Sequence, residues 1–142
     1  MSLVSKILRR GEGGGRVFMT FWCPGCDAPH QVVVEGPGAW GWNGDVHRPT
    51  FTPSVLVWWD EPANLADPEA LKRDIEAARA LREAGATGDA AKVPMSAKRC
   101  HSFVADGVID FLSDCTHALR GKHPIPDWPH PDWGGSVPAT ST

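Results

Sequence analysis

The fold prediction depends mainly on the stretch RCHSFVADGVIDFLSDCTH, residues 99–117. Two runs rich in β-branched and aromatic residues flank Asp106-Gly107, a dipeptide typical of tight turns. The stretch is therefore a predicted β-hairpin. Cys100 and Cys115 stand near its open end, where two thiols can approach one another across the strands.

The remaining two of the four cysteines, Cys23 and Cys26, form a CPGC knuckle. Predicted strands at 17–22 and 31–35 lead into and out of it, which is the first half of a zinc-ribbon arrangement. A CxxC turn presents both thiolates to one ion, and zinc prefers four soft ligands in a tetrahedron. The knuckle and the hairpin together predict one structural zinc ion.

The turn of the hairpin decides which ligands complete this site. A two-residue turn at Asp106-Gly107 puts Cys100 and Cys115 on one face, and the ligands are then Cys23, Cys26, Cys100 and Cys115. A three-residue turn shifts the pairing by one, so that His101 takes the place of Cys100. We favour the all-cysteine set because it leaves no thiol unpaired, with His101 and His117 as alternates.

Composition narrows the class of protein. A chain of 142 residues with a net charge of −3 suits one domain, and its mild acidity argues against nucleic-acid binding as the main role. No apolar run approaches the roughly 20 residues that cross a bilayer, and the N-terminus lacks a signal-peptide core. We expect a cytoplasmic protein that does not bind membranes.

The predicted fold class is mainly β with a small helical insertion (α+β), made of zinc-ribbon-like β-hairpins around one metal site. We expect an N-terminal arm at 1–15, a zinc-binding β domain at 16–121 and a Pro/Trp-rich tail at 122–142. The insertion covers 66–92, where Asp67 is a good N-cap for a helix. The apolar run at 54–59 predicts a strand that is buried on both faces or is a covered edge.

Two interpretations of the proline-rich tail stay open: it wraps the body of its own chain with each Trp anchored in a groove, or it binds a partner, which we favour. Trp128 and Trp133 are suited to anchoring in grooves of another protein, because aromatic residues dominate interface energetics. The expected partners are other proteins or further copies of this chain.

Three segments resemble a family of small proteins encoded by tailed phages and prophages. They read FWCPGC, WNGDVHRPTFTPSVLV and RCHSFVADGVIDFLSDCTHALRGK, and the resemblance covers about residues 21–59 and 99–122. The family's members are often mislabelled as ammonia monooxygenase, a membrane-bound copper enzyme. The resemblance implies a phage origin and a metal site at the family's cysteines, which match Cys23, Cys26, Cys100 and Cys115. A phage origin in turn implies a location in the host cytoplasm or incorporation into a virion, with other virion proteins as partners.

The function favoured by these observations is a phage-encoded, protein-binding structural module with zinc as a rigid staple, and not an enzyme. One alternative is a nucleic-acid-binding zinc ribbon whose basic patch consists of Arg9, Arg10, Arg16, Lys98 and Arg99. The other is a zinc-dependent hydrolase with His101 and His117 among its ligands and Asp114 or Asp110 as the general base. No HExxH motif supports this last reading.

Overall fold

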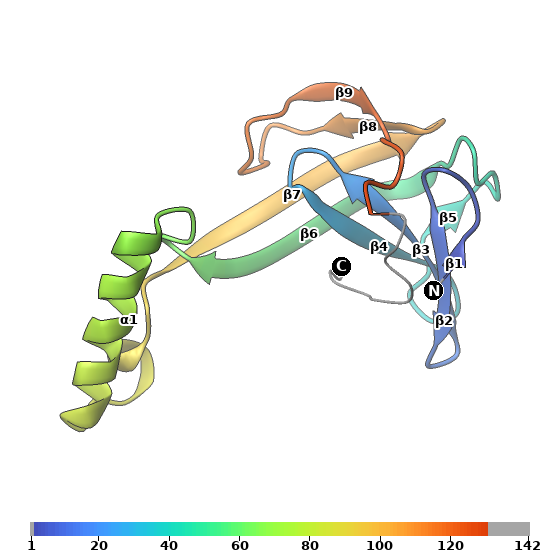
Figure 1. Cartoon of the computed structure of the whole chain (residues 1–142). Helices are drawn as coiled ribbons and strands as arrows, with labels where there is room; N and C mark the ends of the chain where they lie inside the picture. The colour runs from blue at the N-terminus through green and yellow to red at the C-terminus, as the bar shows by residue number, and fades with distance from the viewer. Residues whose placement is uncertain (1, 131–142) are drawn as a thin grey trace. The chain divides into compact units, whose positions relative to one another are not determined.

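The computed structural model describes residues 2–130 and consists mainly of antiparallel β-strands (Figure 1). The first sheet has the order β1-β2-β3-β4, and the second has the order β5-β6-β7-β8-β9. The strands of the first sheet are β1 (Ser2–Leu3), β2 (Arg9–Gly13), β3 (Arg16–Cys23) and β4 (Ala28–Glu35). Those of the second are β5 (Gly41–Trp42), β6 (Phe51–Pro62), β7 (Met95–Ala105), β8 (Val108–Phe111) and β9 (Gly121–Pro124). The mainly β fold is thus confirmed.

The chain divides into two compact units. Unit 1 comprises Met1–Trp58 and Arg99–Thr142, and unit 2 comprises Trp59–Lys98. Unit 2 contains the helix α1 (Pro68–Glu83) and the short 3-10 helix η1 (Gly88–Ala91). The helix begins as predicted, because the Asp67 side chain accepts a hydrogen bond from Ala70 N over 3.2 Å.

The core of unit 1 joins its two sheets. Phe21 on β3 stacks on Phe51 on β6 with ring centroids 6.2 Å apart, and both side chains are fully buried. Along β6, Val55 and Val57 are buried whereas Trp58 is 61% exposed. The expectation that this strand is buried on both faces is therefore wrong. Its side chains alternate because β6 lies inside an antiparallel sheet with one face on the core.

Both predicted tails take part in the fold. The N-terminal segment supplies β1 and β2, and β2 pairs with β3 through the whole of 9–13. Residues Gly121–Pro124 form β9, which pairs with β8 at the edge of its sheet, where proline is tolerated. The segments expected as an arm and a tail are therefore parts of the sheets within residues 2–130.

Trp128 packs inside its own chain. It is 7% exposed, lies 5.8 Å from the Trp22 ring, and has the Arg9 guanidinium 4.7 Å from its ring centroid. Its ring thus packs on its own chain, which corrects the prediction that Trp128 anchors in a groove of a partner. Trp133 lies outside the described residues.

Candidate active site and metal centre

The β7–β8 hairpin has the two-residue turn. Ala105 pairs with Val108, and Asp106 and Gly107 have φ values of 51° and 76°, as a type I′ turn requires. In this register Cys100 is 1% exposed and faces the core, while His101 is partly exposed on the opposite face. Cys100 and His101 therefore face opposite sides of the sheet.

On the core side, four side chains form a group that could hold a metal ion. One ligand atom from each of Cys23, Cys26, Cys100 and His117 lies within 4.8 Å of all the others. Cys23 Sγ is 3.8 Å from Cys100 Sγ, and Cys100 Sγ is 3.4 Å from His117 Nε2. In a zinc tetrahedron with bonds of about 2.3 Å, neighbouring sulfurs lie about 3.8 Å apart. The donor set and its spacing therefore fit zinc.

The knuckle is shaped for this group. Cys26 N donates a hydrogen bond to Cys23 Sγ over 3.4 Å, as expected of a CxxC turn around thiolates. At Gly25 an added Cβ would lie 2.2 Å from the His117 ring, so only glycine lets the imidazole pack against the knuckle. The fit of His117 thus depends on a residue of the CPGC motif itself.

Hydrogen bonding and burial shift the ionisation of these ligands. The hydrogen bond between Cys23 and Cys100 lowers the pKa of the Cys23 thiol, and the same bond raises the pKa of Cys100. Burial lowers the pKa of His117, which favours its neutral form. A neutral imidazole is the form that binds metals.

The structure brings together three of the four cysteines expected as ligands, and the fourth position belongs to His117, one of the two alternates. Cys115 is not in this group among the described residues; its Sγ contacts the His101 backbone instead. The cause is the segment after Phe111. If the β7–β8 pairing continued beyond Phe111 without a change of register, Asp114 would lie opposite Arg99. Instead, Thr116 N donates to Arg99 O over 2.9 Å, so the second segment contains two more residues than regular pairing needs. Those two extra residues bring His117 to the knuckle.

On the outer face, the alternate ligand His101 lies in a different constellation. Its Nε2 is 3.0 Å from Ser54 Oγ, and its Nδ1 is 3.1 Å from Asp114 Oδ2. An ionised carboxylate only accepts hydrogen bonds, so Nδ1 carries the proton and Nε2 is the acceptor that faces the serine hydroxyl. A serine, a histidine and an aspartate joined in this order form the arrangement of a catalytic triad.

Strand geometry and one loop position this triad. Ser54 lies on β6 and His101 on the adjacent strand β7, both on the face away from Val55 and Cys100. Asp114 follows β8, and Arg99 Nη1 lies 3.8 Å from its Oδ2. The His101 and Asp114 side chains are 26% and 41% exposed, so a substrate can reach them from solvent.

Comparison with known protein families identifies a match consistent with this geometry. The model of the family described as bacterial ubiquitination-like system serine protease (BubE) matches residues 3–112 of the 142. The chain belongs to this family. Comparisons with curated proteins and with solved structures gave no significant match.

Membership of the BubE family corrects the expectation that the chain is not an enzyme, because the family's description is that of a serine protease. The matched region includes Ser54 and His101 and ends two residues before Asp114. Asp114 is therefore assigned by its contact with His101 alone.

Sequence reasoning missed Ser54 entirely. The residues around it read TPSVL, and no G-x-S-x-G motif marks it as a nucleophile. The only local signal is a polar residue at the head of an apolar strand. The sequence does suggest roles for Asp114 and His101, but as the general base and a metal ligand of a zinc hydrolase.

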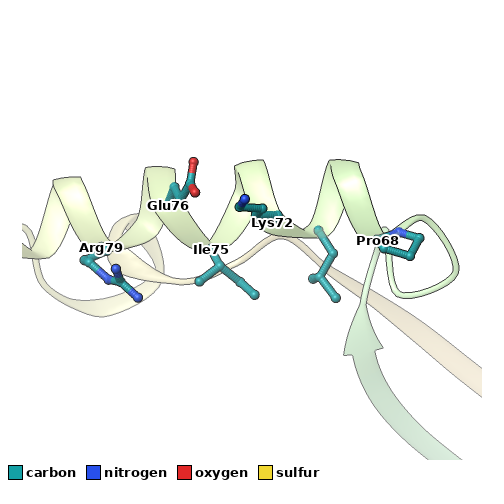
Figure 2. Close-up of a pocket in the computed structure, with 6 residues that line it drawn as sticks. Pro68, Lys72, Ile75, Glu76 and Arg79 are labelled. Carbon is teal, nitrogen blue, oxygen red and sulfur yellow. The ribbon is translucent and has the colours of Figure 1, made fainter.

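One further feature of the structure is a hollow formed by residues outside the triad and the metal group. A hollow of about 340 Å³ lies along α1, and it is lined by Pro68, Leu71, Lys72, Ile75, Glu76 and Arg79. Figure 2 shows how these side chains lie along the helix. None of these side chains belongs to the triad or the metal group.

Within residues 2–130, no helix has the length and apolar character needed to cross a membrane.

Proposed function

We propose that this chain is a serine peptidase with Ser54 as the nucleophile, His101 as the general base and Asp114 as the carboxylate that orients the base. The observation that carries the proposal is the continuous hydrogen-bond chain of 3.0 and 3.1 Å from Ser54 Oγ through both ring nitrogens of His101 to Asp114. The BubE family's description as a serine protease supports the same assignment.

The three side chains divide the reaction as follows. His101 Nε2 takes the proton from Ser54 Oγ as the oxygen attacks the carbonyl carbon of a peptide bond. The resulting imidazolium donates that proton to the departing amine, and water then hydrolyses the acyl-serine with His101 acting again as base. Asp114 accepts the Nδ1 hydrogen bond throughout, which keeps the ring in the productive tautomer and stabilises its positive charge.

The substrate we propose is a protein of a ubiquitination-like system. The support for this choice is the description of the family whose model covers residues 3–112. The open position of His101 and Asp114 suits a polypeptide substrate, because a chain can be laid over the outer face of β6 and β7 without entering a closed cavity.

We further propose that the metal group holds one zinc ion with a structural role. Cys23, Cys26, Cys100 and His117 would supply four protein ligands, and a site closed in this way leaves no position for an activated water. Such an ion supplies a cross-link between β3–β4 and β7. The catalytic chemistry is then left to Ser54, His101 and Asp114.

A covalent probe tests the serine assignment without knowledge of the natural substrate. A fluorophosphonate should label the intact protein once, and peptide mapping should place the adduct on Ser54. Ser54→Ala should abolish labelling while its circular dichroism and metal content stay unchanged. Labelling at another serine, or unchanged labelling of Ser54→Ala, would remove the basis for a Ser54 peptidase.

A phage origin, a virion role and docking to other proteins, which the sequence favours, stay predictions. A peptidase that acts on a protein must bind one, so a protein partner is compatible with the proposal. A structural role in a particle would be tested by looking for the protein in purified virions.

A further inference from the structure

The three residues that follow Asp114 are each held to one of three consecutive residues of β7. Cys115 Sγ accepts a hydrogen bond from His101 N over 3.3 Å and donates to His101 O over 3.2 Å. Thr116 bonds Arg99, and His117 Nε2 lies 3.4 Å from Cys100 Sγ. The segments 115–117 and 99–101 are thus joined at every residue.

We call the contacts between residues 115–117 and 99–101 the clamp, and we propose that this clamp positions Asp114 against His101. Thr116 is the positioning residue whose contribution can be measured separately by substitution. The inference rests on the proposed peptidase function. It assigns no contact with substrate to Thr116. The Thr116 hydroxyl binds the backbone of Arg99, and Asp114 lies only two residues before Thr116 in the chain.

The need for such a clamp follows from where Asp114 lies. The residue comes after β8 ends at Phe111, so no strand pairing fixes its backbone. Its side chain is 41% exposed, and its contact with Arg99 Nη1 is a long one of 3.8 Å at the surface. Surface ion pairs of this kind contribute little to fixing a geometry. Before Asp114, Leu112 N donates to His101 O over 2.9 Å, and the other hydrogen bonds that hold this segment to the backbone of β7 come from the residues after Asp114.

Thr116 makes the most extensive connection of the clamp. Its backbone N donates to Arg99 O over 2.9 Å, and its hydroxyl also donates to Arg99 O, over 3.1 Å. The same hydroxyl accepts from Arg99 N over 3.0 Å. Both backbone groups of Arg99 are therefore bound to one residue. This fixes the distance between the strand that carries His101 and the loop that carries Asp114.

The consequence is measurable because small displacements matter in a triad. A shift of about 1 Å in a catalytic group can cost about a hundred-fold in rate. Thr116→Val keeps the shape of the side chain and removes the hydroxyl, so two of the three hydrogen bonds to Arg99 are lost. We expect the rate of labelling at Ser54 and kcat to fall about ten-fold or more, with KM unchanged. Thr116→Ser restores the hydroxyl and should react within about two-fold of the unmodified protein.

A spectroscopic measurement separates positioning from general destabilisation. The proton on His101 Nδ1 that is bound to Asp114 should give a low-field proton NMR resonance, present in the unmodified protein, in Ser54→Ala and in Thr116→Ser. The resonance should be shifted or lost in Thr116→Val although the protein remains folded by circular dichroism. Thr87→Val is the matched control, because Thr87 makes no side-chain capping bond to η1.

The outcomes distinguish this inference from the proposed function. Labelling of Thr116→Val at the unmodified rate with the resonance retained would overturn the clamp and leave the triad intact. Absence of specific Ser54 labelling in the unmodified protein would overturn the triad and the clamp together. If Thr116→Val does not fold, Thr116→Ala and Cys115→Ala provide the same comparison, since Cys115 Sγ binds the backbone of His101 directly.

Discussion

Cys100 and His101 are neighbours on β7 and project into two different sites. Cys100 Sγ lies 3.4 Å from His117 Nε2 on the core side, and His101 Nε2 lies 3.0 Å from Ser54 Oγ on the outer side. Successive residues of a strand point to opposite faces, so one strand serves both clusters without a change of direction. The two clusters are therefore separated by a single peptide unit of β7.

The role of Asp114 can be tested by removing its charge. Asp114→Asn keeps the size of the side chain but lets its amide present a donor to His101, which favours the wrong tautomer of the ring. We expect kcat/KM to fall by about 10³-fold or more with the fold retained, since the side chain is 41% exposed. The measurement is the rate of fluorophosphonate labelling together with peptide hydrolysis.

Asp110→Asn is the matched control for this change. Asp110 lies on β8 opposite Phe103, and it is the other carboxylate that the zinc-hydrolase alternative offers as a general base. Its substitution should leave the labelling rate within about two-fold. An equal loss in both variants would mean that general charge near the site, and not the bond to His101, sets the rate.

The ligand set predicts which variants lose metal. His117→Ala and Cys100→Ser should each reduce bound zinc from about one equivalent to a small fraction, because each removes one of four ligands. Cys115→Ser should keep the ion, since its thiol lies outside the group among the described residues. Elemental analysis of the purified proteins gives the answer directly. Zinc retained in His117→Ala but lost in Cys115→Ser would establish the all-cysteine site.

Removal of the metal should lower stability, because binding energy at such a site contributes to folding. The chelated protein should melt at a lower temperature than the loaded protein, and added zinc should restore the melting temperature. A chelated protein that melts at the same temperature would show that the cysteines act only as buried thiols.

Much of the fold could be predicted because its signals are local. The CPGC turn, the Asp106-Gly107 hairpin and the capped helix after Asp67 are each encoded within a few residues, and all three are present in the structure. The face occupied by Cys100 also followed from the two-residue turn. Patterns of this kind need no knowledge of distant contacts.

The remaining features depend on contacts between distant segments. Ser54 and His101 are 47 residues apart in the chain, and only the pairing of β6 with β7 brings them together. The exchange of Cys115 for His117 follows from the two residues gained after Phe111, where no turn motif marks the change. Both errors arose where tertiary contacts determine the geometry.

Gly25 is predicted to be essential for the metal group. Gly25→Ala adds a Cβ that would lie 2.2 Å from the His117 ring, so the imidazole must move away from the knuckle. We expect weaker zinc binding and a lower melting temperature in this variant. Gly13→Ala is the control, because a Cβ there has no atom within 4 Å. Equal zinc affinity in the two variants would contradict the close packing of His117 on the CPGC turn.

The segment that carries Trp128 is predicted to be part of the folded core. Trp128→Ala removes a ring that is 7% exposed and packs on Trp22 and Arg9, so it should reduce the free energy of unfolding by about 3 kcal/mol. Trp58→Ala, at a side chain that is 61% exposed, should cost about 1 kcal/mol or less. Truncation after Gly121 should be more severe, since it also removes the strand pairing of β9 and the 2.8 Å bond from Trp128 N to Lys6 O. Urea denaturation measures all three. If the truncated protein is as stable as the full chain, the segment after Gly121 is a separable tail, and its packing on Trp22 does not contribute to folding.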